Sequence, residues 1–388
     1  MMIRNVSISG IGSTEFGKLR DRTIGQLAVD AAEVAIKDSA VDRRDIGAIY
    51  LGNFVSGMLT GQEILAGLVG DNLGLGNIPC TKVEGACASG GIAFRHAYLA
   101  VATGLYNAAL VVGVEKMTHR QSDTITQALN CAIDQSSDGP SGLTFPGLYA
   151  MAWRSYDQRY GAPREDVSAI ILKNKGNGRK NPLAQMKVEV KAEDILNSPL
   201  IADPLRLFDC CPVSDGASSL LLVASDLLPE KASWDIRVAA SVQTSGSARL
   251  AGRNDFCSFD ATVAASRGAF KAAKISPEDI DLVELHDCFS IAEALDCEDL
   301  GLVERGMGLR LAVEGLSQVD GKLPINPSGG LLAKGHPVGA TGVSQIYEAV
   351  LQLRGLHANQ VHDPEFALTH NLGGAGVACT VNIIKRAS

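Results

Sequence analysis

Residues 83–104 have the sequence VEGACASGGIAFRHAYLAVATG. Cys87 stands among small residues, Gly90-Gly91 follow, and apolar side chains then recur at helical spacing over residues 92–102. Because residues 78–83 have the composition of a short strand, we expect a strand, a tight turn at Cys87 and a helix. The free backbone N–H groups and positive dipole of a helix start favour a thiolate. The stretch therefore predicts a catalytic cysteine, with a buried structural thiol as the alternative.

The composition narrows the class of protein. The 388 residues are 46% hydrophobic, which predicts a globular chain of two or three domains. A net charge of −8 argues against nucleic acid and anionic membranes as main partners. Nine cysteines without a CxxC pair predict free thiols, a cytoplasmic location and no metal site. The start, MMIRNVSISG, lacks a signal-peptide segment, and polar residues interrupt the most apolar region, 92–114, so we expect no membrane span.

The order of elements indicates an internal duplication. Ala35-Ile36-Lys37 and the strand expected at 45–51 recur as Ala269-Phe270-Lys271 and a strand at 279–285, with one common offset of 234 residues (269 − 35 and 279 − 45). Two such α/β halves would stack as two sheets with helices between and outside them.

The expected division of the chain follows from this duplication, because the region after Lys116 has no counterpart in the second half. We predict an N-terminal half at 1–116 plus 206–230, an inserted loop domain at 117–205 and a C-terminal half at 231–388. Insertions on such a scaffold usually cover a site.

Two features of the insertion could take part in binding a substrate. The run KNKGNGRK at 173–180 carries four positive charges, which are Lys173, Lys175, Arg179 and Lys180. As a loop it would meet an anionic group such as a nucleotide phosphate, or it would be an ordinary solvated basic loop. Aromatic residues at partial helical spacing are expected to pack the insertion or to line an acyl pocket; they are Phe145, Tyr149, Trp153, Tyr156 and Tyr160.

Two histidines of the second half lie where backbone geometry is restricted. His286 comes directly after the strand expected at 282–285, and Cys288 follows two residues later. In α/β sheets, functional sites often lie at this carboxyl end of the strands. His336 lies in a glycine- and proline-rich loop, 326–342, which suits a base held in one orientation. A last glycine loop, HNLGGAG at 370–376, is expected to bring backbone N–H groups close to an oxyanion.

Four segments together resemble the thiolase family: VEGACASGG around Cys87, HDCF at 286–289, GGLLAKGHPVGATG at 329–342, and HNLGGAG. Their order fits the family over essentially the whole chain. The HDCF form resembles the sterol-carrier-protein type and the thiolases that make acetoacetyl-CoA beside hydroxymethylglutaryl-CoA synthase. The resemblance implies a five-layered α-β-α-β-α fold with duplicated halves. It also implies an acyltransferase that cleaves 3-ketoacyl-CoA with CoA, or runs the reverse Claisen condensation.

The resemblance also implies roles for individual residues. Cys87 would carry the acyl group as a thioester, and His336 would activate it. His286 and His336 would donate hydrogen bonds to the enolate oxygen of acetyl-CoA. The backbone N–H groups of Cys87, Leu372 and Gly373 would face the thioester oxyanion.

The second acid/base is where this chain departs from the common pattern. Many thiolases have a cysteine just before the last glycine loop, where this chain has His370. By resemblance to the sterol-carrier-protein type, Cys288 takes that role, and His370 is the alternative.

The expected partners are CoA and acyl-CoA as substrates, with no permanently bound cofactor. The resemblance implies a homodimer or homotetramer, and a small zinc-ribbon/OB-fold acyl-CoA-binding protein as a further partner. Three other functions remain open: a condensing or retro-aldol enzyme of the same superfamily, a non-catalytic subunit of an acyltransferase complex, and a redox sensor at Cys87. The intact set of Cys87, His286, Cys288 and His336 argues against a scaffold.

Overall fold

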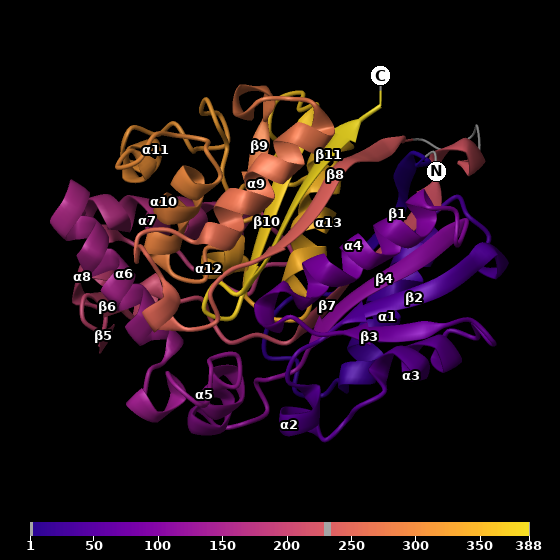
Figure 1. Ribbon diagram of the computed structural model, residues 1–388, viewed down its shortest axis with the longest axis horizontal. Helices are drawn as coiled ribbons and strands as arrows, with labels where there is room; N and C mark the ends of the chain where they lie inside the picture. Colours follow the sequence, from indigo (N-terminus) through magenta and orange to yellow (C-terminus); the bar gives the residue numbers. More distant parts are fainter. Residues whose placement is uncertain (1–2, 229–233, 388) are drawn as a thin grey trace.

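The computed structural model describes residues 3–228 and 234–387, and its centre is a nine-stranded mixed sheet (Figure 1). Where the chain is described, β1 and β8 pair only at Ser7–Arg237, so two half-sheets meet along one edge. In spatial order the strands are β3 (Cys80–Val83), β2 (Ile46–Gly52), β4 (Ala108–Glu115), β7 (Gly216–Ala224), β1 (Val6–Ser13), β8 (Ile236–Ser245), β11 (Ala378–Arg386), β10 (Phe366–Gly373) and β9 (Leu282–Glu284).

The two half-sheets repeat one topology. In the first, β2 and β4 are parallel, and β4–β7 and β7–β1 are antiparallel. In the second, β9 and β10 are parallel, and β10–β11 and β11–β8 are antiparallel. The first half adds β3 beside β2, and in the second half Ile325 pairs with Val283 of β9 through a parallel bridge. The predicted duplication is therefore confirmed.

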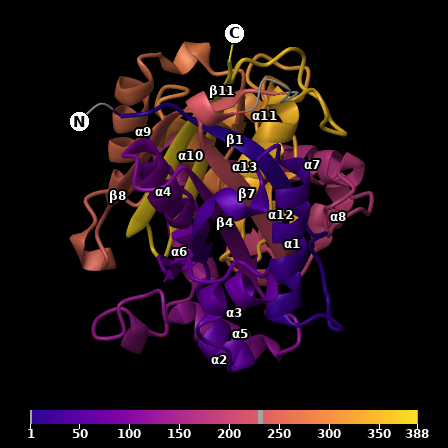
Figure 2. The ribbon, with the colours of Figure 1, turned by 90° about the vertical axis from the view of Figure 1, so that its right-hand side faces the viewer.

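Helices form three layers around the two half-sheets. Helices α1 (Ile24–Asp38) and α3 (Leu65–Asn72) share a core with the outer face of the first half. Helices α4 (Ser89–Ala102) and α13 (Thr341–Leu353) share a core with strands of both halves and lie between them. Helices α9 (Asp260–Ala273) and α10 (Ser290–Asp299) cover the outer face of the second half (Figures 1 and 2). This is the expected α-β-α-β-α arrangement.

Local sequence explains these elements. Thr23 and Gln26 form a capping box at the start of α1, whose alanine-rich face is buried against the sheet. Strands β4 and β7 are buried along their whole length, which matches their near-continuous apolar sequences and the helices on both their faces.

The insertion holds α5 (Ser122–Asn130), α6 (Phe145–Tyr160), α7 (Arg164–Lys180) and α8 (Ala192–Asn197), with the short hairpin β5 (Leu200–Ala202) and β6 (Leu205–Arg206). Buried side chains of α6 and α7 belong to the same cluster as those of α9 and α10, and Figure 1 shows both helices beside α10 and α11 (Gly308–Val313). The insertion thus packs on the second half. The predicted boundary at 230/231 lies outside the described residues.

Two further short helices are α2 (Ser56–Thr60) and α12 (Gly330–Lys334). Within residues 3–228 and 234–387, every helix is too short or too polar to cross a membrane.

Candidate active site

Cys87 lies in a short 3₁₀ turn, Ala86–Ala88, between β3 and α4, so the predicted strand, turn and helix are confirmed. Ala86 has a φ of +51°, in the left-handed region that costs a residue with a Cβ energy. Ser89 holds this turn, because its hydroxyl accepts the N–H of Gly85 (3.0 Å) and donates to the carbonyl of Ala86 (2.6 Å). The local sequence thus fixes the position of the thiol.

Cys87 meets the two predicted histidines. Its Sγ and ring nitrogens of His286 and His336 all lie within 4.8 Å of one another, and we call these three residues the Cys87 cluster. The two imidazole rings are 5.0 Å apart and nearly perpendicular. One thiol and two imidazoles also form a donor set that suits Zn²⁺. The cluster joins three segments that are distant in sequence: the start of α4, the residues after β9 and the loop before α13.

The cluster lines a cavity of about 80 Å³. The other lining residues are mostly apolar: Phe54, Leu129, Ala132, Phe145, Tyr149, Cys211, Cys288, Phe289, Val338, Leu372 and Gly374. A second cavity of about 220 Å³ shares His336, Phe145 and Phe289 with the first, so the two adjoin. Of the predicted aromatic residues, Phe145 and Tyr149 therefore line the pocket, whereas Trp153 and Tyr156 are buried in the core of the insertion and the second half.

Thr341 sets the tautomer of His336. Its hydroxyl donates to the carbonyl of Pro337 (3.1 Å) and lies 2.7 Å from Nδ1 of His336. Because that hydroxyl proton is committed to Pro337, Thr341 accepts from Nδ1–H, and Nε2 of His336 keeps its lone pair. Burial lowers the pKa of His336 to about 3, which holds the ring neutral. His336 is thus prepared to accept a proton at Nε2.

Asn371 sets the opposite tautomer in His286. Its Oδ1 accepts the N–H of Gly91 (3.3 Å), which turns its amide nitrogen toward the carbonyl of Cys87 (2.9 Å) and Nδ1 of His286 (3.2 Å). Since the amide nitrogen donates, Nδ1 of His286 accepts, and its Nε2 carries the hydrogen. Burial lowers the pKa of His286 well below its usual range. One histidine therefore offers a hydrogen-bond donor and the other an acceptor.

Asn371 was not among the predicted site residues, although it stands in the HNLGGAG motif. The motif is part of strand β10 through Gly373, so the prediction of a loop from residue 370 is wrong. Adjacent residues of a strand point to opposite faces. His370 consequently faces α9 and α10, with Nε2 3.0 Å from the hydroxyl of Thr262 and Nδ1 3.5 Å from Asp296. It does not line the pocket, so the alternative role of acid/base does not fit it.

The backbone N–H groups of Cys87, Leu372 and Gly373 stay a prediction as donors to the thioester oxyanion. Leu372 and Gly373 lie at the end of the β10–β11 ladder, and Leu372 and Gly374 both line the cavity beside Cys87. Burial raises the pKa of Cys87 to about 12, and the N–H groups of Gly374 and Cys87 offset this only partly. The expected lowering by the helix start is thus outweighed by desolvation, and the resting thiol is neutral.

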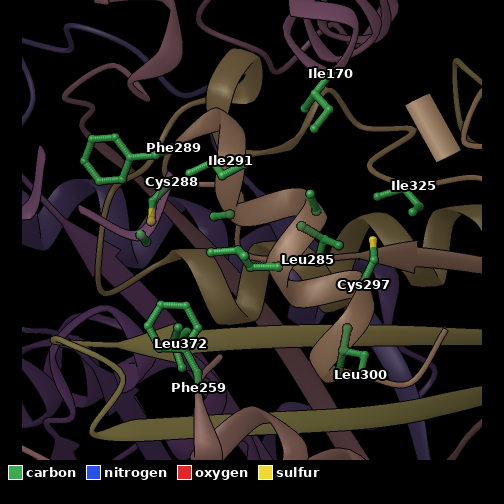
Figure 3. Packing of buried hydrophobic residues seen from close by; sticks show 14 of the residues in the cluster. Ile170, Phe259, Leu285, Cys288, Phe289, Ile291, Cys297, Leu300, Ile325 and Leu372 are labelled. Carbon is green, nitrogen blue, oxygen red and sulfur yellow. The ribbon is translucent and has the colours of Figure 1, made fainter. Parts of the chain in front are cut away.

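Cys288 lines the same cavity and is buried. Figure 3 shows it beside Phe289 and Ile291 at the start of α10. Burial raises the pKa of its thiol well above the usual range. A neutral thiol that faces the cavity is suited to give a proton to a carbon atom held between it and Cys87.

The basic run at 173–180 is not a loop but the last turns of α7. Nζ of Lys173 is buried against the carbonyl of Ile325 (2.7 Å) and Glu293 (3.1 Å). Lys175 is buried as well, donates to the carbonyl of Leu332, and has its pKa lowered to about 8 by burial. The prediction that these two lysines bind a CoA phosphate is therefore wrong.

The other two residues of the run stay a prediction as phosphate ligands. Arg179 pairs with Glu189 (3.4 Å) at the surface, and Lys180 donates to Asn359 (3.2 Å).

Comparison with known proteins shows the family of the chain. The family description "Thiolase, N-terminal domain" matches residues 5–226, and "Thiolase C-terminal domain-like" matches residues 243–386. The acetyl-CoA acetyltransferase of Methanothermobacter thermautotrophicus is 45% identical over 99% of this chain and 100% of its own length. That of Methanocaldococcus jannaschii is 39% identical over 99% of both chains. The solved structure "Ltp2-ChsH2(DUF35) aldolase" is similar with a TM-score of 0.85 and 27% identity, covering 100% of this chain and 99% of that one. The chain therefore belongs to the thiolase family and is a thiolase-type acyltransferase.

Proposed function

We propose that this acyltransferase acts on short-chain substrates: it cleaves acetoacetyl-CoA with CoA and condenses two acetyl-CoA in reverse, through an acetyl group on Cys87. The Cys87 cluster carries the proposal, because it combines a thiol with one histidine acceptor and one histidine donor within 4.8 Å. The cavity at Cys87, about 80 Å³, has room for an acetyl group on the thiol. The names of the two archaeal relatives support the same substrate.

The first half of cleavage uses the whole cluster. Nε2 of His336 takes the proton of Cys87 while Sγ attacks the 3-keto carbonyl of acetoacetyl-CoA. The resulting oxyanion faces the N–H groups predicted for it, those of Cys87, Leu372 and Gly373. The bond between C2 and C3 then breaks, and its electron pair forms the enolate of acetyl-CoA. Its oxygen faces Nε2–H of His286 and of the now protonated His336.

The second half restores the enzyme. The thiol of Cys288 gives its proton to the enolate carbon, which releases acetyl-CoA, and the proton on His336 then passes to the Cys288 thiolate. His336 next takes the proton of CoA, whose sulfur attacks the acetyl thioester. Cys87 leaves as a thiolate and takes that proton back. The balance is one acetoacetyl-CoA and one CoA for two acetyl-CoA.

The experiment is cleavage of acetoacetyl-CoA by the purified protein with and without CoA, beside longer, branched and aromatic 3-ketoacyl-CoAs. Mass spectrometry of the Cys87 peptide after exposure to acetyl-CoA follows the intermediate. We expect cleavage that depends on CoA and one acetyl group on Cys87, both absent in Cys87→Ser. Cys80→Ser is the matched control, because Cys80 lies on β3 outside the pocket.

Two results would contradict the proposal. If the purified protein neither cleaves acetoacetyl-CoA nor carries an acetyl group on Cys87, it does not catalyse the proposed reaction. Cleavage of a 3-hydroxyacyl-CoA without added CoA would instead indicate a retro-aldol reaction, the second candidate, which the similarity to the aldolase structure favours.

We further propose a homo-oligomer that works with a small zinc-ribbon/OB-fold protein and uses CoA as a substrate, without a permanently bound cofactor. The name of the similar aldolase structure, which includes a DUF35 component, supports such a partner. Addition of the partner is expected to lower the KM for CoA. Full activity of the isolated homo-oligomer, unchanged by the partner, would contradict this.

A further inference from the structure

Glu115 is a buried carboxylate at the end of β4, outside the lining of the pocket. Four neutral N–H groups donate to it. Its Oε1 accepts the side-chain amide of Asn53 (2.8 Å) and the backbone N–H of Val55 (3.3 Å). Its Oε2 accepts the backbone N–H groups of Phe54 (2.9 Å) and Gly339 (3.2 Å). Because both oxygens act only as acceptors, the site fits an ionised carboxylate.

The two groups held by Oε2 belong to segments that line the cavity of Cys87. Phe54 lines the cavity itself. Gly339 ends the segment 336–339, which we call the His336 segment, and both His336 and Val338 of this segment line the cavity. One carboxylate oxygen therefore joins the residues after β2 to the segment that carries the proposed base.

The His336 segment is closely packed at this contact. A Cβ on Gly339 would lie 2.6 Å from the carbonyl oxygen of Val114 and 2.7 Å from Cα of Asn53, so the backbone of residue 339 lies directly against both strand ends. A Cβ on Gly90, in the helix that begins just after Cys87, would lie 2.8 Å from the carbonyl oxygen of Gly339. The position of residue 339 is thus coupled to the start of α4.

The other end of the His336 segment is held as well. The hydroxyl of Ser214 accepts the backbone N–H of His336 (3.0 Å), while Glu115 accepts that of Gly339 (3.2 Å). Thr341 holds the imidazole ring through Nδ1. The backbone of the segment is therefore fixed at both of its ends, and Glu115 provides the anchor on the side of β4.

We propose that Glu115 is a positioning residue: through Gly339 it holds the His336 segment against the start of α4, which keeps Nε2 of His336 within reach of the proton of Cys87. This inference rests on the proposed function, in which the S–H bond of Cys87 breaks and the proton moves to Nε2 of His336. A displacement of about 1 Å can cost such a step about 100-fold in rate.

The test is Glu115→Asp, which keeps the negative charge and withdraws the carboxylate from its donors by one methylene. The readout is the rate at which iodoacetamide alkylates Cys87, followed by mass spectrometry of the Cys87 peptide. Iodoacetamide reacts with the thiolate, so this rate reports the transfer of the proton to His336. Burial raises the pKa of Glu115 to about 7, and the rates are measured about one pH unit above that value, where the carboxylate is mostly ionised.

We expect Glu115→Asp to slow the alkylation of Cys87 by about 10- to 100-fold. In a His336→Ala background the same substitution should have no further effect, because the base that Glu115 positions is then absent. Urea unfolding shows whether each variant is folded. Should Glu115→Asp fail to fold, Glu115→Gln carries the same test, since it keeps the length of the side chain and replaces one acceptor oxygen by an NH₂ donor.

Glu298→Asp is the matched control. Glu298 is also a buried glutamate that accepts a backbone N–H, that of Gly308 (2.8 Å), and it lies outside the lining of the cavity. Its substitution should leave the alkylation of Cys87 near the wild-type rate.

A folded Glu115→Asp protein that is alkylated at the wild-type rate would overturn the inference. An equal slowing in the His336→Ala background would overturn it too, because the effect would then not pass through His336. If His336→Ala alone leaves alkylation unchanged, His336 is not the base and the role of Glu115 fails with it. Exchange of labelled CoA into acetyl-CoA tests the proposed function separately: its absence in the wild type would refute that function, while the alkylation rates would still decide the role of Glu115.

Discussion

Asn371→Asp tests the argument that a single amide sets the chemistry of the pocket. The amide nitrogen of Asn371 donates to the carbonyl of Cys87 and to Nδ1 of His286, while its oxygen accepts from Gly91. An aspartate keeps the contact to Gly91 and loses both donated hydrogen bonds. Nδ1 of His286 must then carry the hydrogen in order to bond the carboxylate, and Nε2 loses the proton that would face the enolate oxygen.

The expected magnitude follows from these contacts. Loss of one donor to a developing oxyanion costs about 2.7–4 kcal/mol, or about 10²–10³ in kcat. The carbonyl of Cys87 is left without its donor, which costs about 1–3 kcal/mol in the free energy of unfolding. Asn382→Asp is the matched control, since Asn382 is also a buried asparagine, on the neighbouring strand β11, and bonds Thr369 and Ser241 outside the pocket.

The assay is steady-state cleavage of acetoacetyl-CoA, with circular dichroism and urea unfolding on each variant. We expect both variants to lose stability and Asn371→Asp alone to lose kcat. A folded Asn371→Asp enzyme with wild-type kcat would refute the assignment of the His286 tautomer. An equal loss of kcat in Asn382→Asp would show that the effect is general to buried asparagines of this sheet.

Three further predictions concern charge. Zn²⁺ should inhibit by binding the Cys87 cluster, and EDTA should restore the rate; inhibition that persists in Cys87→Ser would contradict this. Lys173→Met should cost about 3–5 kcal/mol in the free energy of unfolding, because Glu293 is left buried and uncompensated, with an unchanged KM for CoA; a raised KM would revive a phosphate-binding role. Burial lowers the pKa of His370 in the folded protein to about 3, whereas in the unfolded chain it is near 6.5. Between pH 3 and pH 6.5, unfolding therefore takes up a proton. Urea unfolding should therefore show the stability advantage of the wild type over His370→Gln shrinking, by about 1.4 kcal/mol per pH unit, as the pH falls from 6.5 toward 3. A gap that is constant with pH would contradict the buried neutral state.

The predictions from sequence succeeded where a local pattern has a local cause. The turn before α4 depends on the small residues around Cys87, and the duplication appeared as one offset because each half needs the same strand and helix to build its layers. The basic run failed for the opposite reason. Glycine and charge at 173–180 suggested a solvated loop. In the structure Lys173 pairs with Glu293, and both lysines donate hydrogen bonds to main-chain carbonyls of the second half, which compensates for their burial.

The family, the duplicated fold and the catalytic candidates Cys87, His286, Cys288 and His336 follow from the sequence alone, because each motif specifies its own backbone geometry. Which residue of the HNLGGAG motif enters the site depends on the folded sheet. Strand alternation in β10 turns Asn371 inward and His370 outward, and no spacing in the chain shows where that strand ends. The protonation of the site also depends on the tertiary structure, since the segments that desolvate Cys87 and the asparagine that contacts His286 are far apart in sequence.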